Sequence, residues 1–562
     1  MVDYSIKIGG EAGQGVQTVA DSLSRIFLRS GLQVFTIQDY QSRIRGGHSF
    51  TQIRLSDAPL CAMRKEVDML VCLDSATCRI HAGEVSERGL VLGALDQSDP
   101  SYSRSVISLD FAAIAKEAGN PIYANIVAVG AVLGILGFGI NLMEEYLSEV
   151  FRKKGDQVIR ENNNALRKGF QRAQELYGQA LLPDIQQNRD HSSVLLNGND
   201  ALGLGVVLAG CTFYSAYPMT PSSGVLNFVA GRAKEYGILV EQAEDEIAAV
   251  NMAVGASYCG ARAMTGTSGG GFCLMTEGLG LAAMTETPLV ILNAQRPGPS
   301  TGLPTRTSQG DLEFVIHASH DEFPRFVLAP GEPREAMNAV IRAFNLTERF
   351  QVPVILLSDQ YLADTEWTYP DLQVDEKADS PHTVLAVQGY RRYVPTENGV
   401  SPRALPGSGP GLVIADSDEH DEWGHITEDL TIRLSQQEKR MRKIQFMKSA
   451  MRSPRCLEGE DVTLIGWGST YGVLYEVRNN LREKGMRAGL VHFTDLYPMA
   501  TETVELARNL PNPVVVEGNY LGQFARLLER ETGRAFPRRV NAFNGLPFFV
   551  EELEMRIKEI LS

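Results

Sequence analysis

Short apolar runs that end in turns rich in glycine or proline recur along the 562 residues, and each leads into a helical pattern. Val462–Gly466, for example, precedes Gly468-Ser469-Thr470, and Leu289–Ala294 precedes a loop with several prolines and glycines. Strands that alternate with helices in this way form doubly wound sheets, in which most strands are parallel. The sequence therefore predicts an α/β fold built from three such segments, and a chain of this length accommodates about three to five domains.

Polar stretches that contain proline and glycine separate the three segments. We predict domains at residues 1–185, 196–370 and 461–562, a linker at 186–195 and a long connection at 371–460. A connection of that length is uncommon in a compact protein unless it has a function of its own.

Composition excludes several classes of protein. The formal net charge of −15 lacks the basic footprint of nucleic-acid binding, so no nucleic acid is expected as a partner. Asp3 stands where a secretory signal would be basic. The longest apolar run, Ile126–Leu142, is short for a membrane span and lacks flanking anchors, which favours a buried helix. We therefore expect a cytoplasmic protein that makes no membrane contact.

The seven cysteines include no C-x-x-C pair. Iron–sulfur clusters and zinc fingers need several converging ligands that are usually closely spaced. The sequence thus predicts buried, reduced thiols and no metal site within this chain.

A glycine-rich stretch, Gly9–Gly15, lies where the first predicted strand, Tyr4–Ile8, leads into a helix. Backbone N–H groups at a helix start attract phosphate, and glycine permits close approach. Two arginines, Arg43 and Arg45, follow beside a Gly-Gly turn. Gly13, Gly15, Arg43 and Arg45 are therefore candidate contacts for a phosphorylated ligand such as coenzyme A, and a tight turn with solvated arginines fits them equally well.

The second segment carries a more informative turn, Tyr217-Pro218-Met219-Thr220-Pro221, after an apolar strand. Its two prolines make the turn rigid, and its hydroxyl groups are presented where ligands bind in open α/β sheets. Tyr217, Pro218 and Thr220 are thus candidate site residues. The alternative is that the serines after them only start the next helix.

An acidic stretch ends at Glu246, and an alanine-rich helix, Ile247–Tyr258, follows. Acids at a helix start are favoured by the helix dipole, which accounts for most of this stretch. Glu246 differs because small apolar residues follow it, so that its carboxylate is expected to be buried and suited to proton chemistry.

Two further turns follow predicted strands. Ser268 opens a run of three glycines, a backbone that lets a ligand come very close. Arg296 ends the strand Leu289–Ala294, where a guanidinium group can hold a carboxylate with two hydrogen bonds. An ion pair between Arg296 and one of the many acids is the alternative.

Three ordered motifs, YPMTPSS, EDEIAAVNMAVGASYCGARAMTGTSGGG and NAQRPGPSTGLPT, resemble the alpha subunit of 2-oxoacid:ferredoxin oxidoreductases. The resemblance extends over residues 196–562, and GGEAGQGVQT with RIRGGHSFTQIR is similar to the gamma subunit of the same enzymes. It implies a gamma-type α/β domain followed by a pyrimidine-side thiamine-diphosphate domain and a transketolase C-terminal-like domain.

The resemblance also implies the cofactors and partners. Thiamine diphosphate with Mg²⁺ would be shared with a beta subunit, which would also hold a [4Fe–4S] cluster. Ferredoxin would accept the electrons, coenzyme A would accept the acyl group, and an (alpha–beta)₂ heterotetramer is expected.

By the same resemblance, Glu246 matches the glutamate that hydrogen-bonds the aminopyrimidine ring of thiamine. Thr220 and Arg296 match residues that meet the substrate carboxylate and carbonyl, and Thr305 lies in the same loop. Arg306 is a candidate for a second, distal carboxylate, although a surface arginine fits equally well.

The gamma–alpha fusion and the amino-acid sequence of the Arg296 loop resemble the 2-oxoglutarate type most. This resemblance implies that the product is succinyl-CoA and that the reaction runs in reverse under strong reduction, as in a reductive citric acid cycle. Two alternatives stay open. One is the same chemistry on branched-chain or other 2-oxoacids, and the other is a non-catalytic scaffold subunit.

Overall fold

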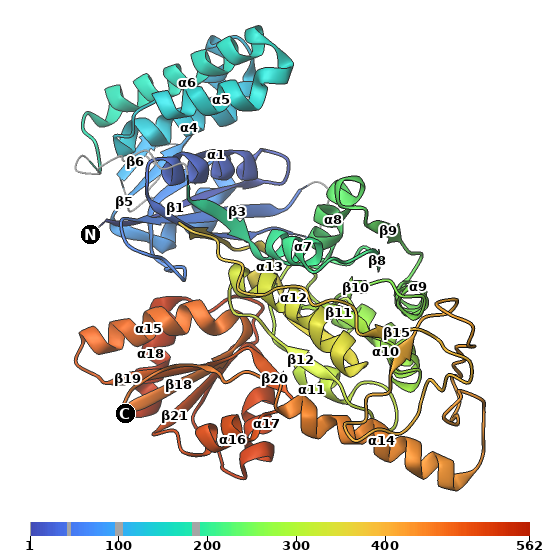
Figure 1. Cartoon of the computed structure of the whole chain (residues 1–562). Coiled ribbons are helices and arrows are strands. Elements are labelled where there is room, and N and C mark those ends of the chain that lie inside the picture. The colour runs from blue at the N-terminus through green and yellow to red at the C-terminus, as the bar shows by residue number, and fades with distance from the viewer. Residues whose placement is uncertain (1, 42–45, 96–104, 183–191) are drawn as a thin grey trace. The chain divides into compact units, whose positions relative to one another are not determined.

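The computed structural model describes residues 2–41, 46–95, 105–182 and 192–562 (Figure 1). These residues divide into two compact units. The first unit comprises the chain up to Leu196 together with Thr365–Leu372 and Phe549–Glu552. The second unit comprises Asn197–Asp364, Gln373–Phe548 and Leu553–Ser562.

An eight-stranded sheet forms the centre of the first unit, in the order β6-β5-β4-β1-β3-β2-β14-β7. Its strands are β1 (Asp3–Glu11), β2 (Gln33–Asp39), β3 (His48–Ser56), β4 (Val67–Cys72), β5 (Val85–Gly93), β6 (Ser105–Ser108), β7 (Val194–Asn197) and β14 (Glu366–Tyr369). Strands β1, β4, β5 and β6 are parallel, whereas β3 runs antiparallel to both β1 and β2. The expectation of mostly parallel strands is thus wrong for half of this sheet, because the connection from Asp39 to His48 is too short for a parallel crossover.

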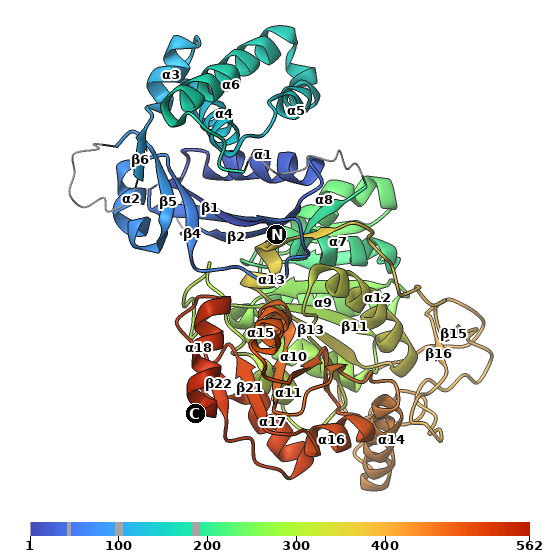
Figure 2. The ribbon, with the colours of Figure 1, turned by 90° about the vertical axis from the view of Figure 1, so that its left-hand side faces the viewer.

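Helices cover this sheet in layers. They are α1 (Val16–Arg29), α2 (Ser75–His81), α3 (Phe111–Glu117), α4 (Ala124–Leu136), α5 (Asn141–Phe151) and α6 (Asp156–Tyr177). Figures 1 and 2 both show α1 between the sheet and the outer layer of α4, α5 and α6. The buried helix predicted for the longest apolar run is confirmed as α4 up to Leu136, whereas the end of the run forms a turn and the start of α5. Gly130 and Gly134 bring α4 against the backbone of α6.

The strand β14 joins this sheet although its residues lie far along the chain. It pairs with β2 in antiparallel register, with Trp367 opposite Phe35. The rings of these two residues meet edge to face at 5.3 Å. The hydroxyl group of Thr368 also donates to the carbonyl of Val34 at 2.9 Å.

A seven-stranded sheet organises the first half of the second unit, in the order β20-β12-β13-β11-β10-β8-β9. Its strands are β8 (Phe213–Ala216), β9 (Leu239–Gln242), β10 (Ala263–Thr267), β11 (Leu289–Gln295), β12 (Phe326–Leu328), β13 (Pro353–Asp359) and β20 (Asp495–Tyr497). All neighbours are parallel except β20, which runs antiparallel to β12. The predicted parallel sheet is therefore confirmed here, apart from one edge strand.

Seven helices of this half are described: α7 (Gly198–Leu208), α8 (Ser223–Tyr236), α9 (Glu246–Tyr258), α10 (Gly269–Met284), α11 (Leu312–His317), α12 (Pro333–Phe350) and α13 (Gln360–Asp364). The alanine-rich helix predicted after Glu246 is confirmed as α9, and the strand predicted before Arg296 is confirmed as β11.

A second sheet, in the order β17-β19-β18-β21-β22, follows in the same unit. Its elements are β17 (Arg455–Leu457), β18 (Val462–Trp467), α15 (Tyr471–Glu483), β19 (Ala488–Phe493), α16 (Thr501–Arg508), β21 (Pro513–Glu517), α17 (Gln523–Thr532), β22 (Arg539–Asn541) and α18 (Val550–Leu561). One cluster of buried hydrophobic side chains includes residues of both parts, among them Phe272 of α10, Trp467 of β18 and Phe524 of α17. The two sheets therefore share a common core.

The connection at residues 371–460 contains two-residue strands, β15 (Thr383–Val384) and β16 (Arg403–Ala404), and the polar helix α14 (Leu430–Lys448). A buried charge cluster fixes it to the end of α10. Lys439 and Lys443 each lie 2.6 Å from a different carboxylate oxygen of Glu286, and all three side chains are essentially inaccessible to solvent. Two ammonium groups that share one buried carboxylate attach α14 to the end of α10, and unlike a surface ion pair they are shielded from water.

Candidate functional site

The candidate residues of the second segment lie along one edge of the seven-stranded sheet. Strands β8, β9, β10 and β11 are parallel, so that their carboxyl ends share this edge. Thr220 follows β8, Glu246 follows β9, Ser268 follows β10 and Arg296 follows β11. Ligands of open α/β sheets bind in the crevice beyond such an edge.

Glu246 is the first residue of α9, and only 3% of it is exposed. The side chain of Asp245 caps the helix by accepting from the N–H of Ala248 at 2.7 Å, so Glu246 is not needed as the cap. The hydroxyl of Thr267 donates to Glu246 Oε1 at 3.4 Å. The prediction of a buried carboxylate at this helix start agrees with the structure.

The first turn of α10 leaves room for that carboxylate because it contains glycine. A Cβ atom on Gly271 would lie 2.3 Å from Glu246 Oε1 and 2.0 Å from Thr267 Oγ1. Any larger residue would therefore displace the carboxylate or the hydroxyl.

Arg296 is half-buried and bridges to the turn after β8. Its Nη1 donates to the carbonyl of Thr220 at 2.8 Å. Burial lowers the pKa of the Arg296 guanidinium, and the charge of Glu246 opposes that shift. Thr220, Glu246 and Arg296 are thus brought together, and the guanidinium group is oriented by the backbone of the Thr220 turn.

Ser268 lies between β10 and α10. Its hydroxyl is buried and has no hydrogen-bond partner among the described residues. A buried hydroxyl without a partner is costly, so its place beside the glycine turn fits a polar ligand group. Tyr217 and Pro218 lie on the exposed part of their turn, on the same edge of the sheet.

Thr305 and Arg306 lie farther along the loop that Arg296 begins. Thr305 is buried, and Arg306 packs against the backbone at Gly545, where an added Cβ atom would come within 3.1 Å of it. The role of Arg306 as a reader of a distal carboxylate stays a prediction.

Asp311 is a carboxylate at this edge that sequence reasoning did not select. Asn293, in β11, donates to Asp311 Oδ2 at 3.1 Å, and a Cβ atom on Gly269 would lie 2.4 Å from that oxygen. Burial raises the pKa of the Asp311 carboxyl to about 6, and the hydrogen bond from Asn293 acts in the opposite direction. The sequence signal was an acid that follows the Arg296 loop directly before apolar residues.

A second overlooked acid, Asp359, ends β13. It accepts from the hydroxyl of Ser469 at 2.5 Å and from that of Thr307 at 3.3 Å. Burial raises the pKa of Asp359, and its hydrogen bonds oppose that shift. Asp359 thereby connects the Arg296 loop to the turn after β18.

The glycine candidates of the first unit line a cavity of about 510 Å³ at the carboxyl end of β1. Gly13 and Gly15 both have positive φ angles, of 96° and 82°, which glycine adopts without strain. Arg43 and Arg45 lie outside the described residues.

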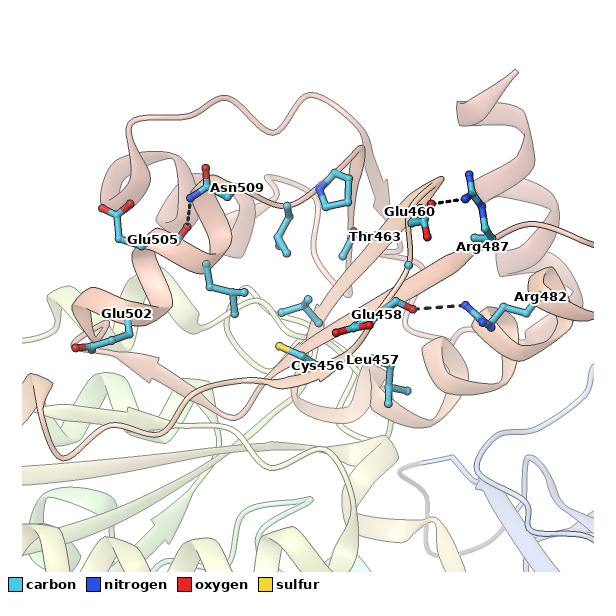
Figure 3. A pocket seen from close by; sticks show the side chains of 15 residues that line it. Cys456, Leu457, Glu458, Glu460, Thr463, Arg482, Arg487, Glu502, Glu505 and Asn509 are labelled. Atoms are coloured by element: carbon cyan, nitrogen blue, oxygen red, sulfur yellow. Dashed lines mark hydrogen bonds and ion pairs between the residues drawn. The ribbon is translucent and has the colours of Figure 1, made fainter.

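A larger cavity, of about 760 Å³, lies against the second sheet of the second unit (Figure 3). Figure 3 shows Glu502 and Glu505 on one side of it and Arg482 and Arg487 on the other. Its lining residues fall between Cys456 and Pro511, so that it contains none of the candidate site residues.

Within the described residues, no group of His, Cys, Asp and Glu side chains is arranged to hold a metal ion. No helix in the described part of the chain has both the length and the apolar character needed to cross a bilayer.

Matches to protein-family models assign this α/β fold to a thiamine-diphosphate-binding class. Residues 204–439 match the model described as pyruvate flavodoxin/ferredoxin oxidoreductase, thiamine-diphosphate-binding. Residues 5–172 match pyruvate ferredoxin/flavodoxin oxidoreductase, and residues 454–544 match the transketolase C-terminal domain. The fold class predicted from the sequence is thereby confirmed.

Individual relatives specify the family of this chain more closely. The 2-oxoacid:ferredoxin oxidoreductase alpha subunit of a Sulfolobus species is 33% identical over 99% of this chain and 96% of its own length. The 2-oxoglutarate synthase subunit KorA of Archaeoglobus fulgidus is 36% identical over 60% of this chain and 90% of its own length. A solved structure, the 2-oxoglutarate:ferredoxin oxidoreductase of Magnetococcus marinus with 2-oxoglutarate, coenzyme A and succinyl-CoA bound, covers both chains fully at 32% identity and a TM-score of 0.93.

The chain therefore belongs to the 2-oxoacid:ferredoxin oxidoreductase alpha subunits that carry a fused gamma domain. The resemblance found in the sequence motifs is confirmed at the level of this family. As an alpha subunit, the chain acts in a multisubunit oxidoreductase together with a beta subunit.

Proposed function

We propose that this chain is the alpha subunit of a 2-oxoglutarate:ferredoxin oxidoreductase that forms succinyl-CoA and CO₂ with coenzyme A. The observation that carries the proposal is the convergence of Glu246, Thr220 and Arg296 on one sheet edge. The relatives named for 2-oxoglutarate support this acid as the substrate. The Sulfolobus relative is named for 2-oxoacids in general, so a broader substrate range is the second candidate.

The residues present fit thiamine diphosphate. Glu246 would hold its pyrimidine ring, the unpartnered hydroxyl of Ser268 would meet a polar group, and Tyr217 with Pro218 would border the ring. When bound, the thiazolium ring of this cofactor serves as the electron sink of decarboxylation. The Mg²⁺ ion, the [4Fe–4S] cluster and most of the diphosphate contacts are assigned by this proposal to the beta subunit.

The chain's own residues have three tasks at this site. Arg296, oriented by the Thr220 carbonyl, presents a cation to the carboxylate of the 2-oxoacid. Glu246, of which only 3% is exposed, would exchange a proton with the pyrimidine ring. Thr220 offers its hydroxyl at the same turn. An (alpha–beta)₂ assembly, ferredoxin as electron acceptor and a cytoplasmic location belong to the same proposal, as do the domain boundaries given above.

Arg296→Ala tests the substrate assignment in the complex with the beta subunit. Losing a hydrogen bond to a charged group costs roughly 1.5–3 kcal/mol, so kcat/KM for the oxoacid should fall about ten- to 150-fold. Binding of coenzyme A should change little. Arg349→Ala, an exposed arginine on α12, is the matched control.

Arg306→Ala tests whether the substrate is 2-oxoglutarate or another 2-oxoacid. Turnover of 2-oxoglutarate should fall in this variant while turnover of pyruvate stays the same, because only 2-oxoglutarate has a distal carboxylate. Equal effects on both acids would remove Arg306 from the proposal, and a wild-type preference for branched-chain acids would favour the broader enzyme.

A further inference from the structure

The loop that begins at Arg296 closes on itself at its two ends. It runs from Arg296, after β11, to Asp311, directly before α11. The backbone N–H of Asp311 donates to Oε1 of Gln295, the last residue of β11, at 3.1 Å. Gln295 is buried, and its Nε2 donates to the carbonyl of Ser358 at 3.1 Å. Because Gln295 directly precedes Arg296, a shift of the Asp311 end is passed to the residue that carries the guanidinium group.

A single glutamine attaches the far end of this loop to the second sheet of the same unit. Gln309 is buried, with 3% of it exposed. Its backbone N–H donates to the carbonyl of Gly518 at 2.7 Å, and the N–H of Gly518 donates back to Gln309 Oε1 at 2.8 Å. Its Nε2 donates to the carbonyl of Trp467 at 2.8 Å, and its own carbonyl accepts from Nδ2 of Asn519 at 3.1 Å.

The bonds of Gln309 have a common origin. Both of its main-chain polar atoms and both of its side-chain polar atoms are paired, as buried polar groups need to be. Trp467 ends β18, and Gly518 and Asn519 directly follow β21. All four bonds therefore come from the carboxyl ends of two neighbouring strands of the second sheet.

Neighbouring residues strengthen the same attachment. The hydroxyl of Ser308 donates to the carbonyl of Gly518 at 3.3 Å. Gln523, the first residue of α17, donates through Nε2 to the carbonyl of Gly310 at 2.7 Å and accepts through Oε1 from the N–H of Glu313 at 2.9 Å. The attachment therefore extends from the end of the loop into α11.

Arg296 is thus held from two directions. On one side, its Nη1 donates to the carbonyl of Thr220 at 2.8 Å. On the other side, Gln309 fixes the end of the loop that closes beside it. The middle of the loop, residues 298–303, is exposed, so burial does not fix it. A binding group that is misplaced by about 1 Å can cost about 100-fold in rate, which makes the anchored end important for catalysis.

We propose that Gln309 is a positioning residue for the 2-oxoacid, because it anchors the loop of residues 296–311 on the second sheet and so places Arg296 for the substrate carboxylate. The inference rests on the proposed function, in which Arg296 presents a cation to that carboxylate. It gives the part of the chain that matches the transketolase C-terminal domain a role in binding the 2-oxoacid.

The test compares two buried glutamines in the complex with the beta subunit. Gln309→Ala removes the side-chain bonds to Trp467 and Gly518, so KM for the 2-oxoacid should rise about ten- to 100-fold with a smaller change in kcat. Gln351→Ala is the matched control. Gln351 is also 3% exposed, and its Nε2 donates to the carbonyl of Ser401, in the long connection, at 2.7 Å. KM should keep its wild-type value in this control.

A second variant guards against failure of the alanine variant to assemble. Gln309→Met keeps most of the side-chain volume and removes the same two hydrogen bonds, so it should give the same rise in KM. Hydrogen exchange of the peptide that covers residues 297–311, measured by mass spectrometry, should become faster in both variants.

Exchange of the thiamine C2 proton separates positioning from a general loss of structure. That exchange is assigned to Glu246, which belongs to α9 and lies outside the loop. It should therefore proceed at the wild-type rate in Gln309→Ala, although KM for the 2-oxoacid is raised.

A double-mutant cycle shows whether Gln309 acts through Arg296. In the Arg296→Ala background, Gln309→Ala should lower kcat/KM by no more than about twofold further, since the guanidinium group that it positions is absent. A further loss as large as that in the wild-type background would mean that Gln309 does not act through Arg296 and would overturn the inference.

Three other outcomes would also overturn it. They are a wild-type KM in Gln309→Ala or Gln309→Met, an equal rise of KM in Gln351→Ala, and a loss of C2 proton exchange in Gln309→Ala. A wild-type KM in Arg296→Ala would contradict the proposed function itself. A raised KM in Arg296→Ala together with a wild-type KM in Gln309→Ala would overturn this inference alone.

Discussion

At the scale of one residue, the burial of the Glu246 carboxylate bears on its proposed chemical role. The carboxylate accepts a hydrogen bond from Thr267 and interacts electrostatically with the half-buried Arg296, while Asp245 caps α9. The side chain is therefore not required to start the helix. We propose that its burial instead serves the proton exchange assigned to Glu246 above.

Glu246→Gln should therefore lower turnover strongly without unfolding the protein. Glutamine fills the same space but cannot exchange a proton, so activity of the complex should fall about 10²–10⁴-fold. Exchange of the thiamine C2 proton into heavy water, followed by NMR, measures the step directly. The exposed neighbour Glu244→Gln is the control. Exchange at the wild-type rate would mean that Glu246 is an ordinary acid of a helix start.

Asp311 makes the stability of the chain depend on pH. Its pKa is about 6 in the folded chain, against the usual 3.8. Between these values the folded chain binds more protons than the unfolded chain, so stability falls as pH rises from about 4 to about 6. The full effect is about 3 kcal/mol above pH 6.

Asp311→Asn should remove this loss and keep the acceptor for Asn293. The variant should thus unfold at a higher temperature than the wild type at pH 7.5, with a smaller difference at pH 4.5. Calorimetry at both pH values measures the effect. The same difference at the two values would show that Asp311 ionises freely in the folded chain.

The sequence identified Glu246 and Arg296 but not Asp311, and the reason is physical. Glu246 is followed by small apolar residues of its own helix, which signals burial locally. Asp311 instead contacts Asn293 of β11 and lies against Gly269 of α10, which come from other parts of the sequence. Pairs such as His48 and His81 likewise meet only when the sheet of the first unit has formed.

At the scale of elements, the contact between α9 and α10 sets the position of the candidate carboxylate. Gly271 is the residue of α10 that permits it, because an added Cβ atom would collide with Glu246 and Thr267. Gly255, in α9, has open space around it. Replacing each glycine by alanine therefore distinguishes the effect of a close contact from the effect of helix propensity.

Gly271→Ala should lower activity at least tenfold, since overpacking at this point costs about 1–3 kcal/mol and moves the carboxylate. Gly255→Ala should leave activity unchanged and stabilise α9, because alanine exceeds glycine by about 1 kcal/mol in a helix. Turnover and unfolding midpoints of both variants check this. Full activity in Gly271→Ala would show that the carboxylate tolerates displacement.

Elements were predicted well where a local apolar run ended at a turn, as for β11, β18 and α9. Their pairing was predicted less well. The antiparallel β3 and the edge strand β20 depend on loop length and on residues far along the chain, which periodicity does not reveal.

At the scale of the whole molecule, the chain is one part of an enzyme. Its described residues include no cluster-type arrangement of metal ligands, and its cysteines lack the spacing of a cluster site. The purified chain should therefore be colourless and inactive. Co-expression with the beta subunit should give a brown complex that binds thiamine diphosphate, which absorbance and cofactor analysis would measure. A stoichiometric iron–sulfur absorbance from this chain alone would contradict the assignment of the cluster to the partner.

The strand β14 has a consequence for separate production of the first unit. This unit draws its sheet from residues up to Leu196 and again from Glu366–Tyr369, after the second unit has begun. A gene cut after residue 196 would thus yield a protein with β2 as a bare edge, where Phe35 would lose Trp367. Bare edges of this kind recruit other strands and aggregate. A first unit produced on its own therefore needs another strand or a partner chain to cover β2, and Glu366–Tyr369 supplies that cover within one chain.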